Sequence, residues 1–141
     1  MSRLVPPLLF VLLVGFLTPA PVWAQNGARC TTPESQEAIK GFRELLASVE
    51  KEVVLSVRVD YEGVYFDPVI WTMMDLDQKK TLIRIADIYH DCVVVTETLG
   101  IDPTQRTWSC GVKVFRSDSG REIAAIKGGW LRACEFEFYW P

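Results

Sequence analysis

The sequence predicts an α+β fold in which an antiparallel sheet of about four to five strands carries two helices on one face. Three observations lead to this prediction. Apolar residues recur at helical spacing within residues 33–51 and again after Asp75. Segments rich in β-branched residues occur at 53–66 and 111–140, separated by turn residues. The last segment places its apolar side chains on one face, which helices can then cover.

The first 24 residues have the pattern of a secretory signal peptide. Arg3 supplies a positive start, residues 8–17 are apolar, and Val22-Trp23-Ala24 ends in a small residue suited to signal peptidase. A membrane anchor is the alternative. It needs about 20 apolar residues, whereas the uninterrupted stretch here is shorter and prolines follow it. We therefore predict cleavage after Ala24 and export to the periplasm or the outside, with no integral membrane segment left.

The remaining 117 residues suit one domain. We divide them into a flexible leader, residues 25–31, and a single α+β domain, residues 32–141. Because Arg3 is the one charged residue removed, the net charge changes from −3 to −4. The acidic excess is scattered, and no basic stripe is present for nucleic acid or for an anionic membrane surface. We expect neither as a partner.

The four cysteines, Cys30, Cys92, Cys110 and Cys134, all follow the predicted cleavage point. An even number in an exported chain predicts two disulfides. No C-x-x-C pair supports a redox role. A zinc site that also uses His90 is the alternative, but the spacings fit no familiar zinc pattern. We favour disulfides, and expect no metal and no cofactor.

The domain begins with a helix and a hairpin. Thr32 is the expected N-cap, with Pro33 at the first position of an amphipathic helix over residues 33–51. Residues 53–59 and 64–66 then form a hairpin around the turn residues 60–63. Residues 67–74 form an apolar connection that contains Trp71.

Asp75 can cap the second helix, which contains Leu82 and Tyr89. This helix continues to Leu99 if Gly100 supplies a left-handed stop. A short strand over residues 93–96 is the competing interpretation, because three valines favour it. We favour the helix, followed by a loop over 101–108.

The last third predicts a three-stranded meander over residues 111–116, 121–127 and 130–140, with Gly128-Gly129 as a hairpin turn. In the register that pairs Arg116 with Arg121 and Lys127 with Trp130, charged residues 113, 122, 135 and 137 share the outer face. The inner face then carries Val112, Val114, Ile123, Ala125, Cys134, Phe136, Phe138 and Trp140.

The same register bears on the disulfide pairing. It places Cys110 beside Lys127 and Cys134 opposite Ile123, roughly 13 Å apart along the strands at the usual strand rise. A disulfide requires Cα atoms within about 7 Å. We therefore predict Cys92–Cys110 with Cys30–Cys134. The rival is Cys30–Cys92, which would leave two free thiols or an intermolecular bond.

No catalytic constellation is visible, so we do not expect an enzyme. His90 follows Asp87-Ile88-Tyr89 and precedes Asp91, but no nucleophile stands in a recognisable turn, and a histidine at a helix end is typically solvated. Asp75-Leu76-Asp77 lacks the glycine and the distal glutamate of a calcium loop, and helix capping explains Asp75.

Two binding features remain. The chain ends in Glu135, Phe136, Glu137, Phe138, Tyr139 and Trp140, a strand that can pair with a protein partner or a second copy if it lies at the sheet edge. If it lies inside the sheet, it is only structural. The tryptophans and tyrosines can alternatively line a small-ligand pocket between helices and sheet, although core packing is their commoner use.

The middle of the chain has a pattern at residues 64–68, Trp71, Lys79, Leu82, Ala86, Tyr89 and 119–124. In this pattern it resembles small uncharacterised bacterial exported proteins in which a hairpin, a helix running from a tryptophan to a lysine and an SGREIA hairpin follow one another. The resemblance covers about residues 57–127 and implies an arrangement and a bacterial origin, but no activity.

Overall fold

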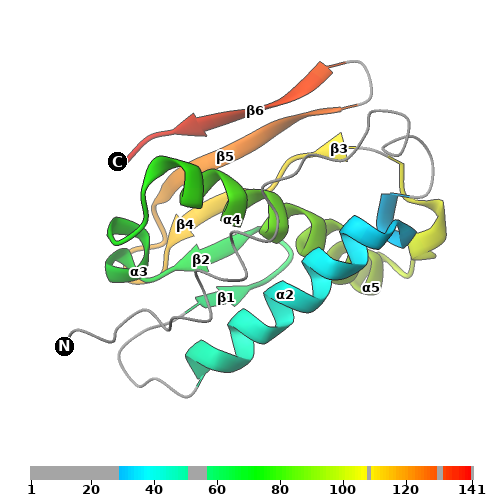
Figure 1. Ribbon diagram of the computed structural model, residues 1–141, viewed down its shortest axis with the longest axis horizontal. Helices are drawn as coiled ribbons and strands as arrows, with labels where there is room; N and C mark the ends of the chain where they lie inside the picture. Colours follow the sequence, from blue (N-terminus) through cyan, green and yellow to red (C-terminus); the bar gives the residue numbers. More distant parts are fainter. Residues whose placement is uncertain (1–28, 51–56, 108, 130–131, 141) are drawn as a thin grey trace.

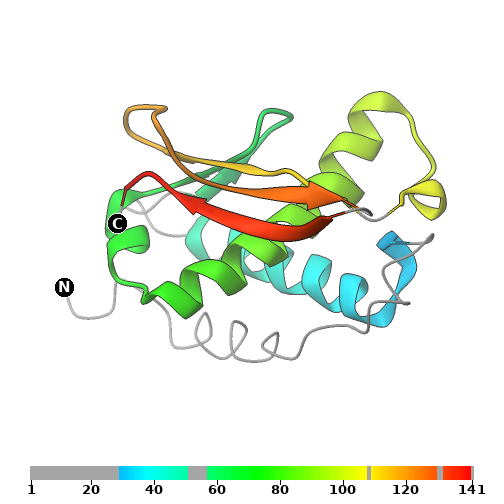
Figure 2. The same cartoon turned by 90° about the horizontal axis from the view of Figure 1, so that it is seen from above.

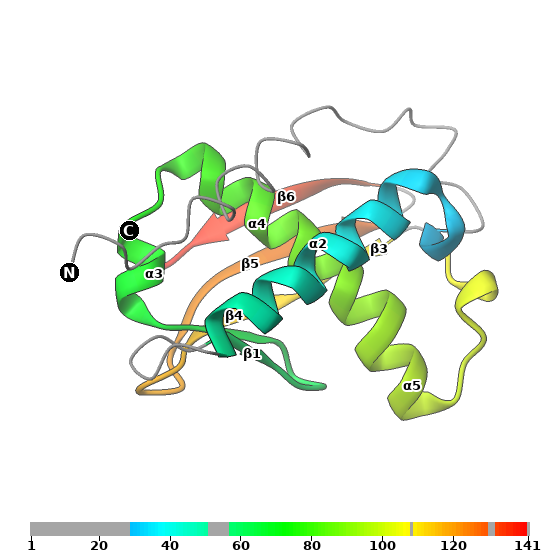
Figure 3. The same cartoon turned by 60° about the horizontal axis from the view of Figure 1, so that its bottom comes forward.

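The computed structural model describes residues 29–50, 57–107, 109–129 and 132–140. It confirms an α+β fold, in which a curled, largely antiparallel sheet forms a half-barrel with two main helices on one face (Figures 1 and 2). Figure 3 shows both helices, α2 (Pro33–Glu50) and α4 (Leu76–Tyr89), lying across the sheet. The predicted signal peptide, residues 1–24, lies outside the described residues, as does the first part of the predicted strand at 53–56.

The sheet has six strands rather than the predicted four to five. Their order is β1-β2-β4-β5-β3, with β6 on the other side of β5. The pair of β2 and β4 is parallel and the other pairs are antiparallel. The strands are β1 (Val57–Val59), β2 (Val64–Phe66), β3 (Ser109–Cys110), β4 (Lys113–Arg116), β5 (Glu122–Gly129) and β6 (Arg132–Phe138).

Both helices begin as the sequence predicts. The Thr32 hydroxyl accepts the Ser35 N–H at 3.1 Å at the start of α2. At α4, the Asp75 carboxylate accepts the Gln78 N–H, and the Gln78 side chain accepts the Asp75 N–H in return, which forms a capping box. The short α3 (Pro68–Thr72) occupies the predicted apolar connection and is capped by Asp67.

The helical path after α4 continues to the predicted stop. A π-helical segment η3 (His90–Val95) leads into α5 (Thr96–Leu99), which ends at Gly100 with φ 67°. The alternative strand at 93–96 is therefore wrong. A 3-10 turn, η4 (Pro103–Gln105), lies in the loop that follows.

The core lies between the two helices and the sheet. Trp71 and Phe66 have no exposed surface, and Phe42 of α2 is equally buried against the Tyr89 ring, with 4.9 Å between ring centroids. Burial of each such aromatic side chain stabilises the fold by about 1.5–3 kcal/mol. These three aromatic side chains are thus used for packing.

The C-terminal meander is confirmed, but its register differs from the prediction. As predicted, Arg116 lies opposite Arg121, and its backbone N–H donates to the Arg121 carbonyl. Lys127, however, pairs with Glu135 rather than with Trp130. Gly128 and Gly129 are the end of β5, not the turn. A register shift in the β4–β5 pair also moves Ala125 to the outer face, where it pairs with Lys113 and Glu137.

The predicted leader, residues 25–31, overlaps the described chain at Arg29–Thr31, which pack against the domain. These residues form the 3-10 turn η2, in which Arg29 and Cys30 are 2% and 1% exposed. The reason is local chemistry: Cys30 is in a disulfide, and Arg29 ion-pairs with Asp87 and Asp91.

Candidate functional site

The C-terminal strand β6 lies at an edge of the sheet (Figure 1). It pairs with β5 through Ala124–Phe138, Ala125–Glu137, Ile126–Phe136 and Lys127–Glu135. No other strand of the described chain pairs with it. At seven residues it is much longer than the opposite edge strand β1, which has three. An edge of this length is open to pairing with a further strand.

The backbone of β6 has a defined donor and acceptor pattern. The Tyr139 N–H donates to the Ile123 carbonyl at 2.8 Å. Because bonds to one neighbour alternate along an antiparallel strand, Glu137 and Glu135 also direct their backbone groups to β5. The backbone N–H and C=O groups of Phe136, between them, point away from β5 and toward the open edge.

Helix α4 runs beside this edge and encloses a groove with it. The groove has a volume of about 580 Å³. From the helix it is lined by Leu76, Lys80 and Arg84, which follow one another at intervals of four and therefore form one stripe. From β6 it is lined by Cys134, Glu135, Phe136 and Phe138.

The α4 wall of the groove carries two cations, and the β6 wall carries aromatic rings. The Lys80 Nζ lies 5.8 Å from the Phe136 ring centroid, and the Arg84 guanidinium lies 5.0 Å from the same centroid. Neither cation forms an ion pair with a carboxylate of the described residues. Leu76 is 53% exposed at one end. A groove with these walls favours apolar or anionic side chains.

The outer face of β6 has the opposite charge. Glu135 is exposed there, and Glu137 accepts a hydrogen bond from the Tyr139 hydroxyl and lies 3.3 Å from Lys127 Nζ. The bond from Tyr139, followed by the one from Lys127, lowers the pKa of the Glu137 carboxyl below its usual value. Glu137 therefore stays ionised, and the outer face of the edge remains acidic.

One disulfide anchors the N-terminal end of β6. Cys110 of β3 and Cys134 of β6 are bonded, and their Cα atoms lie 6.1 Å apart. The predicted pairing of Cys92 with Cys110 and of Cys30 with Cys134 is therefore wrong. The error comes from the register: Cys134 was expected opposite Ile123, whereas Lys127 in fact pairs with Glu135, so Cys134 lies beside Gly128.

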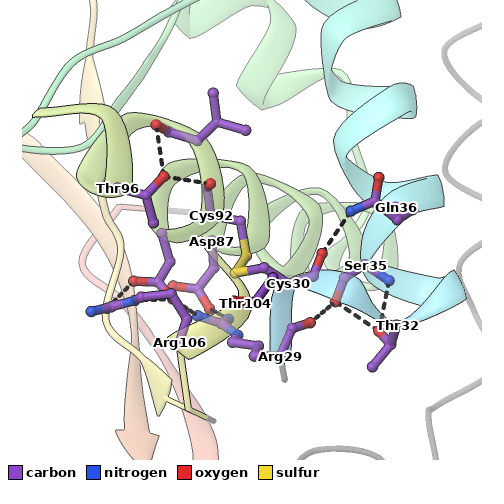
Figure 4. The surroundings of a disulfide bond; sticks show 12 residues. Arg29, Cys30, Thr32, Ser35, Gln36, Asp87, Cys92, Thr96, Thr104 and Arg106 are labelled. Atoms are coloured by element: carbon purple, nitrogen blue, oxygen red, sulfur yellow. Dashed lines mark hydrogen bonds and ion pairs between the residues drawn. A yellow bond between two sulfur atoms is a disulfide. The ribbon is translucent and has the colours of Figure 1, made fainter. Parts of the chain in front are cut away.

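The second disulfide, Cys30–Cys92, joins η2 to the π-helical segment after α4, with 5.5 Å between Cα atoms (Figure 4). This bond belongs to the rival pairing, but the two free thiols or the intermolecular bond of that rival are wrong, because Cys110 and Cys134 are bonded to each other. Cys30, Asp91 and Cys92 are close enough to suggest a metal site. However, the two sulfurs are bonded to each other, and Asp91 is ion-paired to Arg29 and Arg106.

A buried ionic cluster surrounds this disulfide. The Arg29 guanidinium forms ion pairs with the carboxylates of Asp87 at 2.5 Å and Asp91 at 2.7 Å. Arg106 forms an ion pair with Asp91 as well. The second oxygen of Asp87 accepts the N–H groups of Gly111 and Val112 at 3.0 and 3.1 Å. Two arginines thus balance two aspartates, and the cluster joins η2, α4, η3, the residue after η4 and the segment before β4. The mutual pairing of these charges indicates a structural role.

The other candidate residues that the structure describes, among them His90, Asp75 and Trp71, form hydrogen bonds within the fold. The His90 ring lies 2.8 Å from the Tyr61 backbone oxygen, and Asp75 caps α4. Trp71 donates its indole N–H to the Trp140 carbonyl and is fully buried, so it lines no pocket. Trp108 and Trp130 lie outside the described residues. Lys80 and Arg84 were not predicted as site residues, although Leu76, Lys80 and Arg84 follow one another at intervals of four in the sequence.

No protein-family model matches the chain, and neither the curated proteins nor the solved structures contain a significant match. Across the described ranges, no helix has the length and apolar character needed to cross a bilayer. Function must therefore be inferred from the geometry of the molecule.

Proposed function

We propose that this chain is an exported, non-enzymatic protein that binds another polypeptide by pairing it with the edge strand β6. The observation that carries the proposal is the open seven-residue edge, whose Phe136 backbone groups face away from β5. An extended segment placed there gains main-chain hydrogen bonds, while its alternate side chains enter the groove beside α4.

The remaining features of the molecule support this role. The disulfide from Cys134 to Cys110 and the contacts of Phe136 and Phe138 with the core hold the edge in a fixed position before a partner arrives. A preformed edge reduces the ordering cost of binding. Two disulfides also suit an oxidising compartment outside the cytoplasm, in agreement with the predicted signal peptide.

The proposal is tested by site-specific photo-cross-linking in the native cell. A photo-reactive amino acid in place of Glu135 reports on the edge strand. The same amino acid in place of Lys113, which is equally exposed on the outer face of β4, is the matched control because β4 has strands on both sides. We expect a discrete adduct with one polypeptide from position 135 and none from position 113.

Amide hydrogen exchange then establishes the binding mode. After the cross-linked polypeptide has been identified and purified, its addition should protect the amide of Phe136 from exchange. Equal adducts from both positions, adducts from position 113 alone, or no adduct would each overturn the proposal. A bound partner that leaves the Phe136 amide unprotected would also overturn it.

A further inference from the structure

The two faces of the edge strand have opposite charges, and from this we infer the chemistry of the partner segment. It is an extended strand with acidic and apolar side chains on the face toward α4 and basic side chains on the other face. This inference rests on the proposed function and specifies the ligand of the same site.

The face toward α4 is selective because its cations have no acidic partner among the described residues. Lys80 and Arg84 lie over the Phe136 ring, and Arg84 is exposed. An incoming strand lies about 4.8 Å beyond β6, which brings its groove-facing side chains to the stripe of Leu76, Lys80 and Arg84. A carboxylate in the middle of the partner's groove-facing positions then lies next to Lys80 and Arg84. An apolar side chain at the end of these positions lies next to Leu76.

The opposite face selects basic residues. Side chains of neighbouring strands that lie directly across from each other have Cβ atoms about 4.5–5.5 Å apart, and opposite charges stabilise such pairs while like charges destabilise them. Glu135 and Glu137 occupy this face of β6. Lysine or arginine across from Glu135 is therefore favoured, and glutamate or aspartate there is disfavoured.

A second copy of this chain does not satisfy both requirements. If two β6 strands pair antiparallel about their centre, Glu135 of one copy lies near Glu135 of the other on the outer face. Alternation along β6 turns Cys134, Phe136 and Phe138 toward α4, while Glu135 borders the groove from between them. The side chains that a second copy would direct at Lys80 and Arg84 are therefore apolar. The charges thus favour a different chain as occupant.

The inference is tested with two capped nine-residue peptides of the same composition, five lysines, two valines and two glutamates. In the matched peptide the odd positions are lysine, and the even positions are valine, glutamate, glutamate and valine. In the control peptide each face carries both lysine and glutamate. Binding to the oxidised, exported protein is measured by titration calorimetry, and amide exchange of Phe136 is recorded in parallel.

We expect the matched peptide to bind at least about tenfold more tightly than the control and to protect the Phe136 amide. The double variant Lys80→Glu, Arg84→Glu should lose roughly tenfold or more in affinity for the matched peptide. Lys113→Glu, a lysine exchange with the same sign outside the groove, should leave this affinity unchanged.

Three results would overturn the inference. Equal affinity of the two peptides, with Phe136 protected in both, would leave strand pairing intact but remove the charge selectivity. Failure of the matched peptide to bind would exclude the stated ligand chemistry, while the cross-linking experiment still decides the proposed function. Concentration-dependent dimerisation in sedimentation experiments that protects Phe136 would make a second copy the occupant.

Discussion

The Cα atoms of Cys110 and Cys134 lie 6.1 Å apart, although the two residues belong to strands on opposite sides of β5. Strands two positions apart in a flat sheet are separated by about 10 Å. Gly128 lies between the two cysteines: it pairs with Cys110, and a Cβ atom added to it would be 2.8 Å from the Cys134 Cα. The absent side chain lets the strands approach closely enough for the bond.

Gly128→Ala should therefore destabilise the protein. The new methyl group would meet the Ala133 carbonyl oxygen at 2.7 Å, and because this atom is backbone, β5 and β6 must separate. We expect a loss of about 1–3 kcal/mol in the free energy of unfolding, measured by urea denaturation of the oxidised protein. Gly111→Ala is the control, since a Cβ there meets nothing within 4 Å. Equal stability of the two variants would contradict the close approach.

Peptide mapping without reductant should yield the pairs Cys30–Cys92 and Cys110–Cys134. The two bonds should also differ in their effect on stability, because they span 62 and 24 residues. In the chain-entropy model, removing Cys30–Cys92 by alanine substitution costs about 1 kcal/mol more than removing Cys110–Cys134. Recovery of a Cys92–Cys110 peptide would refute the pairing.

Arg29→Met should be strongly destabilising, because it leaves Asp87 and Asp91 buried without their main cation. Breaking a buried pair by removing one partner costs about 3–5 kcal/mol. Lys127→Met removes an exposed ion pair instead and should cost at most about 1 kcal/mol. Thermal unfolding of both variants at neutral pH measures the contrast. Similar melting temperatures for the two would show that the Arg29 cluster contributes little.

Tyr139→Phe should change the titration of Glu137. The Tyr139 hydroxyl is the main cause of the lowered pKa of the Glu137 carboxyl, so its removal should raise that pKa toward 4.5, as seen by NMR titration of the carboxyl carbon. Tyr61→Phe, at an exposed tyrosine, should leave it unchanged.

The pH dependence of stability follows from the pKa shifts of Glu137 and Tyr139. Because folding lowers the pKa of Glu137, its stabilising contribution is present above pH 4.5 and is lost as the pH falls through the folded value. Folding raises the pKa of Tyr139 above 10.0, so its contribution is lost as the pH rises through that higher value. The difference in the free energy of unfolding between wild type and Tyr139→Phe should therefore be largest between pH 4.5 and pH 10.0. A constant difference at all pH values would contradict the hydrogen bond.

Hydrogen exchange of the free protein should distinguish neighbouring residues of β6. We expect the amide of Phe136, which faces the open edge, to exchange faster than those of Glu135 and Glu137, which face β5. Heteronuclear NMR after transfer into D₂O measures all three. Equal protection would show that the edge is already covered in the free protein.

Local signals made much of this fold predictable. Thr32, Asp75 and Gly100 define helix ends through hydrogen bonds and a left-handed conformation that depend on neighbouring residues alone. The parallel pairing of β2 with β4 was not predictable in this way, because it joins segments about fifty residues apart.

The register of β6 shows where sequence reasoning failed. The Gly128-Gly129 dipeptide favours a tight turn, but the structure uses Gly128 for close packing and continues β5 through it. Because the predicted turn lies at residues 128–129, the predicted register placed Cys134 opposite Ile123 of β5. In the structure Cys134 lies beside Gly128. The candidate groove was missed for a related reason: the stripe of Lys80 and Arg84 gains its meaning only when β6 lies beside α4.

The order of the disulfides along the chain has a consequence for biogenesis. Each bond joins consecutive cysteines, the first to the second and the third to the fourth. A chain that crosses a membrane N-terminus first exposes Cys30 and Cys92 before either of the others. An oxidase that joins thiols as they emerge would therefore produce both native bonds directly, and maturation would not depend on an isomerase to rearrange a wrong pair.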